Sequence, residues 1–389
     1  MKSLNTISKI LIGIIFIFSG FVKGIDPLGT TYKFIDYFEA FGLDFLSPIA
    51  IPLAILLNAS EFLIGISLLF SSKIKYGAWA VLLFMSFFTI LTFFLAIYNP
   101  VSDCGCFGDA IVLTNWHTFY KNIIILFFTL IVFINRNKYN TTTTQSLQWG
   151  ILSVGFVLII AISAYSYNHL PIIDFRPYKI GANISEEMII PDNAPQAEYK
   201  TVLEYKKNER IKKFSLNNLP DSSWEWVSSE NILIKEGYIP PIHDFTISTQ
   251  DDNDITDIVL SENKFTFILV AYNLNKSNIK NIENINSLSK YCNSSINCNF
   301  ICLTSSLNND IDKFKDQYNS SFSFYNTDEI TLKTIVRSNP GIMLIKNGTI
   351  LGKWHYNDIP NIPILEKDFI TNKKFNSNKK YKSQNQINV

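Results

Sequence analysis

Hydrophobic residues gather in five long runs within the first 167 residues, and short polar segments separate them. The runs cover residues 8–22, 48–70, 76–98, 118–134 and 147–167. A helix needs ~20 apolar residues to cross a hydrocarbon core of ~30 Å, and the first run approaches this length when it extends to Ile25. Residues 23–27 offer no good signal-peptide cleavage site, so we expect the first run to remain as a span. Five runs so close together predict a membrane bundle rather than buried core helices.

The segment 28–45, between the first two runs, carries aromatic side chains at steps of three and four residues, with acidic residues between them. This spacing predicts an amphipathic helix that lies along the outer membrane surface. Such a helix could cover the mouth of the bundle or only connect two spans, and the sequence leaves both roles open.

Beyond residue 167 the long apolar runs end. Residues 169–178 contain Pro171 and Pro177 and predict an extended exit from the membrane. Residues 198–206, 212–217 and 223–234 alternate as strands, with a turn at residues 208–209. They predict a small β-unit that ends near residue 240.

From residue 244 strands and helices alternate, which predicts an α/β domain. We expect strands at 265–272 and 300–304, helices at 279–292, 310–318 and 330–336, and a hairpin of 341–346 with 349–354. The chain then divides into a four-span membrane domain (1–137), a fifth span (138–170), a β-rich linker unit (171–240), an α/β domain (241–370) and a disordered polar tail (371–389).

Composition supports this division. Hydrophobic residues make up 47% of the 389 residues, but Ile, Leu and Phe dominate the first part while Asn, Lys, Ser and Asp dominate the rest. The formal net charge is only +1, and no extended basic surface could follow a phosphate backbone. The lipid bilayer is therefore an expected partner and nucleic acid is not.

Lysine and arginine in the short loops indicate the orientation of the spans. They precede the first run, follow the second and follow the fourth, at positions 2, 9, 73, 75, 136 and 138. These positions belong inside, which places the N-terminus in the cytoplasm and everything after residue 167 outside. All five cysteines then face an oxidising compartment, where disulfides persist. We expect a multi-pass protein of a bacterial inner membrane with a periplasmic C-terminal domain.

Cys104 and Cys106 stand one residue apart in the sequence DCGCFG, between the third and fourth runs. Such a pair can exchange electrons as a dithiol, staple a turn, or hold a soft metal, for which His117 is the nearest further ligand. A disulfide across one glycine would be strained and therefore oxidising, and Gly105 and Gly108 permit the turn. Redox exchange is the preferred use, and we assign no metal site.

Glu61 is an acid well inside a span, where a carboxylate is costly unless it is paired or faces a polar cavity. Lys23 is its expected partner. A hydrogen bond to Ser19, Ser60 or Asn58 is an equally weighted alternative.

The charged residues beside the cysteines have opposite effects on the thiol pKa values. Asp103 and Asp109 should raise the thiol pKa values by like-charge repulsion, whereas Lys121 should lower them. The sequence does not decide which effect is larger.

The motif IFSGFVK at 17–23, the acid at position 61 and the motif DCGCFG at 103–108 resemble the DoxX/MauE family of redox-associated membrane proteins. The resemblance covers about residues 1–137, and the layout with a fifth span and a long outer region resembles a Bacteroidetes-type version. It implies a four-helix core associated with periplasmic thiol–disulfide chemistry. MauE itself is linked to maturation of the disulfide-rich methylamine dehydrogenase, and a methylamine role here would rest on the family name alone.

The elements from residue 244 onward, with Asn339-Pro340 before the final hairpin, resemble the thioredoxin fold. The resemblance implies a cis peptide bond before Pro340. It also places an active-site Cys-x-x-Cys after the strand 265–272, but residues 273–278 read NLNKSN. We therefore expect a binding module that lacks dithiol catalysis.

The other three cysteines lie elsewhere in this domain. Cys292 and Cys298 flank a short loop and could form a structural disulfide. Cys302 falls on a predicted buried strand and is expected to be an inert core thiol.

Together these observations favour a membrane thiol–disulfide oxidoreductase in which Cys104 and Cys106 cycle. The outer domain would then present an unidentified extracytoplasmic thiol or disulfide protein. The alternative is a non-enzymatic scaffold that anchors a thioredoxin-like binding domain. A third hypothesis places a quinone near Glu61, although no haem or flavin motif accompanies it and no cofactor is evident.

Overall fold

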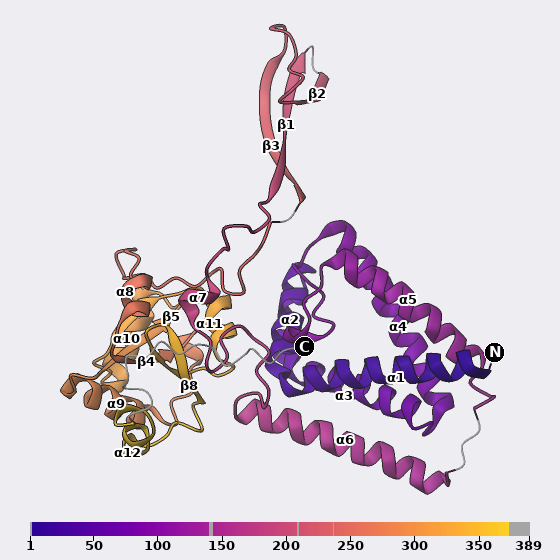
Figure 1. Cartoon of the computed structure of the whole chain (residues 1–389), viewed down its shortest axis with the longest axis horizontal. Coiled ribbons are helices and arrows are strands. Elements are labelled where there is room, and N and C mark those ends of the chain that lie inside the picture. The colour runs from indigo at the N-terminus through magenta and orange to yellow at the C-terminus, as the bar shows by residue number, and fades with distance from the viewer. Residues whose placement is uncertain (1, 140–142, 208–209, 236, 373–389) are drawn as a thin grey trace.

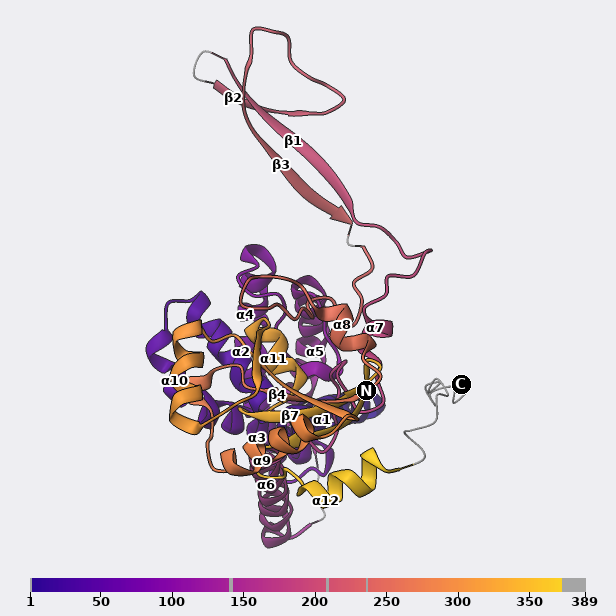
Figure 2. The same ribbon diagram turned by 90° about the vertical axis from the view of Figure 1, so that its left-hand side faces the viewer.

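The computed structural model describes residues 2–139, 143–207, 210–235 and 237–372. It has three parts: a bundle of long helices, an α/β domain beside one end of the bundle, and a three-stranded sheet that projects away from both (Figure 1). Figure 2 shows the same projection of the sheet from the side of the α/β domain.

Within the described residues, five helices are long and apolar enough to cross a membrane. They are α1 (Lys2–Ile25), α3 (Ala50–Leu69), α4 (Ile74–Tyr98), α5 (Asn115–Ile134) and α6 (Gln145–Asn168). Each coincides with one of the apolar runs, which confirms the prediction of a multi-pass membrane bundle. The runs form helices because a bilayer offers the backbone no hydrogen-bond partners.

Glycines bring α1 and α3 into backbone contact. A Cβ atom on Gly20 would lie 2.5 Å from the backbone nitrogen of Phe62, and one on Gly65 would lie 2.5 Å from that of Ile17. Small residues permit this close approach between membrane helices. Because Lys23 follows Gly20 by about one helical turn, its side chain starts on the same side of α1, facing α3.

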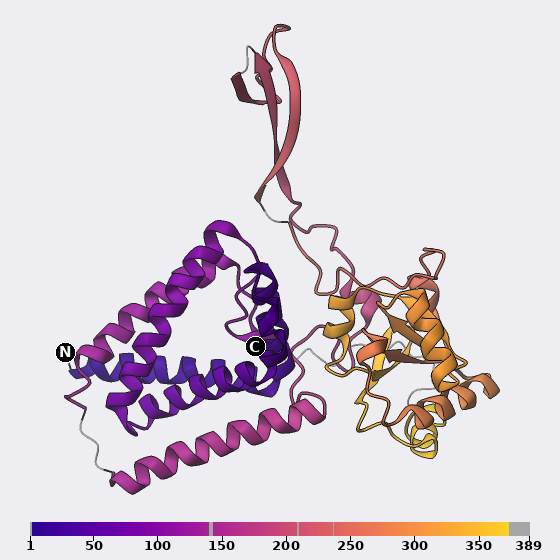
Figure 3. The same cartoon turned by 180° about the vertical axis from the view of Figure 1, so that it is seen from behind.

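The α1–α3 pair lies between two other layers. Helices α4 and α5 form a hairpin on one side of it, and α6 runs along the other (Figure 3). Phe16 of α1 meets Phe84 of α4 with ring centroids 5.4 Å apart. On the opposite side, Ile159 of α6 packs in one cluster with Ile66 of α3.

Helix α2 (Pro27–Ala40) lies across the end of the bundle nearest the α/β domain (Figure 1). Asp26 caps it by accepting a 2.9 Å hydrogen bond from the Gly29 backbone nitrogen, and Pro27 occupies its first position. A 3₁₀ turn (Asp44–Ile49) then leads into α3. The helix expected over 28–45 is present but ends at Ala40.

The α/β domain contains a five-stranded mixed sheet in the order β6-β5-β4-β7-β8. The strands are β4 (Phe265–Val270), β5 (Cys298–Thr304), β6 (Ser323–Asn326), β7 (Gly341–Lys346) and β8 (Thr349–His355). The first three are parallel, and β7 and β8 run antiparallel to their neighbours. This arrangement is consistent with a thioredoxin-like α/β domain. Strand β6 was not predicted, because four residues are too few to show an alternating pattern.

Helices cover both faces of this sheet. One face packs against α9 (Ile282–Ser294), α10 (Asn308–Tyr318) and α12 (Ile362–Leu365). The other packs against α7 (Ile184–Glu187), α8 (Thr256–Ser261) and α11 (Glu329–Ile335). Every residue of the central strand β4 is buried, as expected for a strand covered on both faces.

The projecting sheet consists of β1 (Glu198–Lys207), β2 (Arg210–Ser215) and β3 (Glu225–Lys235), all antiparallel. The three predicted strands are confirmed, and the turn predicted at 208–209 lies outside the described residues. The predicted start of this unit at residue 171 differs from the structure. Tyr178 and Ile184 are buried in the core of the α/β domain, so this stretch belongs to that domain. The predicted tail lies almost wholly outside the described residues.

Arg337 of the α/β domain joins the membrane domain through two carboxylates. Its Nε lies 2.8 Å from Asp26 Oδ2, and its Nη2 lies 2.7 Å from Asp109 Oδ2. Beside it, Tyr32 of α2 meets Tyr272 in an edge-to-face contact, with ring centroids 6.4 Å apart. Arg337 is only 6% exposed and Asp26 is 18% exposed, so this ion pair is largely shielded from water, whereas Asp109 is 37% exposed. The two ion pairs together join the two domains.

We predict that Arg337→Gln separates the α/β domain from the bundle. Removing one partner of a buried ion pair leaves uncompensated charge and costs about 3–5 kcal/mol. Hydrogen exchange should therefore accelerate in α2 and around residues 108–110. Arg210→Gln, on an exposed strand, is the matched control and should leave exchange there unchanged. Equal exchange in the two variants would contradict a role of Arg337 in docking.

The pH dependence of docking follows from Asp26. Burial acts to raise its pKa, but the neighbouring Arg337 and Arg176 guanidinium groups hold the pKa below the ordinary value. The stabilisation is then complete above the unfolded pKa of about 3.9 and is lost as the pH falls through the lower folded value. We expect the protection of α2 amides, measured relative to their intrinsic exchange rate at each pH, to be constant from about pH 5 to 8 and to fall only in stronger acid.

Candidate functional site

The loop 99–114 between α4 and α5 carries the Cys-Gly-Cys sequence and is anchored at its base. Asn99 ends α4 in a left-handed conformation, with φ of 46°. The Asn115 side chain donates 2.8 Å hydrogen bonds to Asn99 Oδ1 and to the Val101 carbonyl oxygen. The first residue of α5 therefore holds both the end of α4 and the start of the loop.

The two cysteines form a tight turn. Asp103 Oδ1 accepts a 2.8 Å hydrogen bond from the Gly105 backbone nitrogen, and Gly105 adopts a φ of +66° that favours glycine. The Sγ atoms of Cys104 and Cys106 lie 2.9 Å apart, and both residues are free thiols. The turn thus places the two sulfur atoms within contact distance of each other without a bond between them.

The two thiols differ in acidity. The hydrogen bond from Cys104 lowers the pKa of Cys106 to about 6; burial opposes this effect, and the charges of Lys121 and Lys23 support it. The same hydrogen bond, with burial, raises the pKa of Cys104 well above its ordinary value. Cys106 is therefore a thiolate at neutral pH while Cys104 keeps its proton. A reactive pair needs this difference, because the thiolate is the nucleophile.

A buried ion pair lies directly behind the cysteine loop. Lys23 Nζ and Glu61 Oε1 are 2.5 Å apart, and both side chains are 5% exposed. Ser19 Oγ lies 2.8 Å from Glu61 Oε2 and 2.7 Å from the carbonyl oxygen of Cys106. The proposed partner Lys23 and the alternative partner Ser19 both contact Glu61, and Ser19 connects the ion pair to the loop. Asn58 instead donates to the Lys23 carbonyl oxygen.

The acids beside the cysteines are each matched by a cation. Lys33 Nζ lies 2.6 Å from Asp103 Oδ2, and Arg337 pairs with Asp109. Lys121 Nζ lies 4.4 Å from the centre of the Phe107 ring, next to the thiols. The hydrogen bond from Cys104 is the largest effect on the pKa of Cys106, and the charge of Lys121 lowers it further. The sequence left open whether the acids or Lys121 would have the larger effect.

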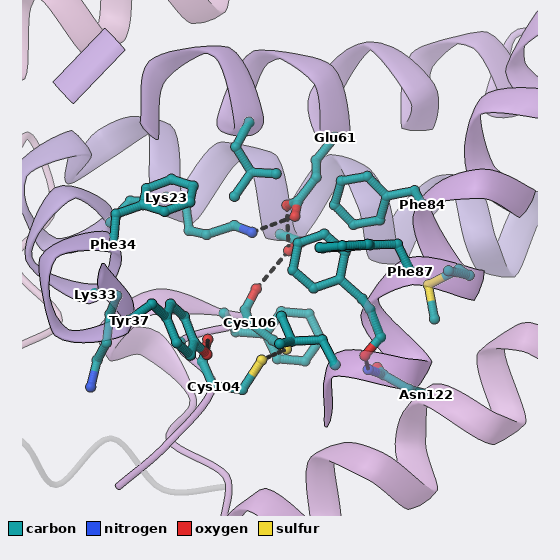
Figure 4. A pocket seen from close by; sticks show the side chains of 18 of the residues that line it. Lys23, Lys33, Phe34, Tyr37, Glu61, Phe84, Phe87, Cys104, Cys106 and Asn122 are labelled. Carbon is teal, nitrogen blue, oxygen red and sulfur yellow. Dashed lines mark hydrogen bonds and ion pairs between the residues drawn. The ribbon is translucent and has the colours of Figure 1, made fainter. Parts of the chain in front are cut away.

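An apolar cavity of about 280 Å³ opens beside this turn, between α1, α2, α3, α4 and α5. Its polar end is formed by Lys23, Glu61, Cys104, Cys106 and Lys121. Aromatic and aliphatic side chains of these five helices form the remaining walls. Figure 4 shows the cysteines and Glu61 around the same space as Phe84 and Phe87.

The α/β domain contributes no thiol to this site. Cys292 and Cys298 are free, buried and hydrogen-bonded to each other, so a disulfide between them stays a prediction. Cys302 is fully buried. The Asn339–Pro340 bond is cis.

Within the described residues, no three His, Cys, Asp or Glu side chains gather as a metal site, and His117 Nδ1 lies 2.8 Å from Thr114 Oγ1.

Three contributors to the site were not predicted: Lys33, Tyr37 and Arg337. The Tyr37 hydroxyl donates a 3.0 Å hydrogen bond to the Cys104 carbonyl oxygen. Tyr37 and Lys33 lie on the amphipathic segment that the sequence identified, and this was the available signal. Arg337 is 311 positions away from Asp26, so no local pattern could reveal the contact.

We predict that alkylation of Cys106 by iodoacetamide follows a titration with a midpoint near its pKa of about 6. Reaction should increase as the pH rises, because thiolate is the reactive form. Lys121→Met removes a nearby positive charge and should move the midpoint upward by about one unit. Lys75→Met, an exposed lysine on α4, should leave it in place. An unshifted midpoint in Lys121→Met would refute the electrostatic explanation.

Comparison with known proteins identifies parts of the chain. Residues 1–135 match the family model of methylamine utilisation protein MauE, which covers the first four spans and the cysteine loop. Residues 199–236 match a domain of unknown function, DUF8463, which coincides with the projecting sheet. No curated protein matches the chain. This chain is therefore a multi-pass membrane protein whose N-terminal region, residues 1–135, is of the MauE type.

Proposed function

We propose that this protein carries out thiol–disulfide exchange at the outer face of a bacterial inner membrane, with Cys104 and Cys106 as the reacting pair. The observation that carries the proposal is the geometry of the turn: two free sulfur atoms lie 2.9 Å apart. Oxidation to a disulfide would require only a small approach of the two atoms.

The two cysteines have different roles in this proposal. Cys106 is more exposed than Cys104 and is the thiolate, so a mixed disulfide with a partner protein forms at Cys106. Attack by Cys104 then forms the Cys104–Cys106 disulfide and releases the partner as a thiolate. In the reverse direction, a partner thiolate attacks Cys106 and Cys104 leaves. Either direction transfers two electrons, through the same intermediate.

The proposed orientation places the loop and the α/β domain in the oxidising compartment. Both lie at the same end of the bundle (Figure 1). Arg337 of the α/β domain pairs with Asp109, which follows Cys106 by three positions in the loop. A partner bound on the α/β domain would therefore be brought near the reactive turn. The lack of a Cys-x-x-Cys in this domain supports a docking role rather than a second redox centre.

We predict that Cys104→Ser accumulates a mixed disulfide at Cys106 in cells, because the resolving thiol is lost. Non-reducing gels of membranes should show a higher-mass adduct that dithiothreitol removes. Cys106→Ser should show little adduct, and the Cys292→Ser/Cys298→Ser double variant, which leaves the turn intact, should match the parent chain.

A second measurement tests the cycle itself. On a Cys292→Ser/Cys298→Ser background, a membrane-impermeant maleimide should label two more thiols after reduction than after oxidation, and adding Cys104→Ser should abolish the difference. If both cysteines stay in one state under all conditions, the pair is structural. The scaffold function would then be favoured.

A further inference from the structure

The cavity beside the cysteines extends from the loop into the membrane-spanning region. Phe84, Phe87 and Leu91 of α4 line it, and Phe87 falls near the middle of this 25-residue helix. Phe87 is nevertheless 61% exposed. Because Phe87 lines the cavity and is also exposed on the outside of a spanning helix, the cavity opens there toward the hydrocarbon core of the bilayer. A ligand would enter from the bilayer and would have to be lipophilic.

The size and walls of the cavity restrict the ligand further. About 280 Å³ lies just below the range of about 300–1,000 Å³ for small-molecule sites, so a single ring system fits and a long tail does not. The rings of Phe34, Phe84 and Phe88 offer stacking surfaces for a flat group. A tail would remain in the opening beside Phe87.

The polar end of the cavity favours a group that gains negative charge. Lys23 is matched by Glu61, and Lys33 is matched by Asp103. Lys121 makes no salt bridge within the part of the chain that the structure describes, and its ammonium group lies over the Phe107 ring. One uncompensated cation thus faces the end of the cavity where the sulfur atoms lie.

We propose that this cavity binds the head group of a membrane quinone, which oxidises the Cys104–Cys106 dithiol. The inference rests on the proposed thiol chemistry and supplies its electron acceptor. A quinone ring is flat and lipophilic, carries carbonyl acceptors for a cation, and becomes negatively charged as it accepts electrons. These properties match the walls, the opening and the charged end of the cavity.

The reaction balances as a two-electron transfer. The S–S bond forms between Cys104 and Cys106, and the two electrons pass to the quinone. The Cys104 thiol supplies one proton, and a second proton comes from water to complete the quinol. Lys121 stabilises the thiolate before the transfer and the quinol anion after it. The resulting disulfide can then oxidise a partner dithiol.

Binding can be tested separately from electron transfer. The Cys104→Ser/Cys106→Ser variant in lipid nanodiscs should bind decylubiquinone in a calorimetric titration. Adding Leu91→Trp fills the cavity and should weaken binding by about tenfold or more. Leu83→Trp is the matched control, because Leu83 is exposed on α4 outside the cavity and should have no effect. Ile125→Phe, a second cavity variant, should weaken binding in the same direction.

Electron transfer is tested on the chain with both cysteines intact. After reduction and removal of the reductant, decylubiquinone should be converted to quinol with loss of two alkylatable thiols per protein. Leu91→Trp should slow this conversion about tenfold or more without changing alkylation of Cys106, which also verifies folding.

The outcomes separate the two proposals. Equal binding of decylbenzene, which has the tail but no carbonyl groups, would make the cavity a lipid groove and overturn the quinone site. Thiol cycling with a protein partner but no quinone reduction would overturn this inference and leave the proposed function standing. Quinone binding without any change in the thiols would also overturn this inference. Thiols that cycle with neither quinone nor a partner protein would contradict the proposed function.

Discussion

The ion pair between Lys23 and Glu61 is the interaction on which the rest of the membrane site depends. Two charges in the apolar interior are costly unless they are paired and hydrogen-bonded, and here the glycine contacts of α1 and α3 bring the helices close enough for a 2.5 Å pair. Ser19 links this pair to the Cys106 carbonyl oxygen. The cysteine turn is thereby held against the close backbone contact of α1 and α3.

Charge compensation around the turn accounts for its chemistry. Asp103 accepts a hydrogen bond from the Gly105 backbone nitrogen and forms an ion pair with Lys33. Asp109 forms an ion pair with Arg337. With both acids matched, the positive charge of Lys121 can act on the thiols. Two chemically identical cysteines one residue apart thus acquire opposite pKa shifts, through their mutual hydrogen bond and the groups around them.

The α/β domain meets the bundle through the face that includes Tyr272, at the end of β4, and Arg337, shortly before Pro340. The thioredoxin resemblance would place a catalytic Cys-x-x-Cys on this face. In this chain the corresponding segment has no cysteine, and the face holds the two domains together. Cys104 and Cys106 are therefore the site where thiol chemistry is proposed.

The length of the apolar runs was sufficient to predict the five spans, because a helix must be long and apolar to cross the lipid. The periodicity of apolar residues was sufficient to predict the three strands of the projecting sheet and most of the α/β elements, because burial in a core imposes a repeating pattern. The Cys-Gly-Cys turn and Glu61 were equally visible, since their residue types are unusual where they occur. Only the tertiary structure decided that Lys33 and Arg337 neutralise the nearby acids and that a cavity opens beside the thiols. These features join residues from distant parts of the chain, such as Asp26 and Arg337, and electrostatic balance depends on distances that no local pattern contains.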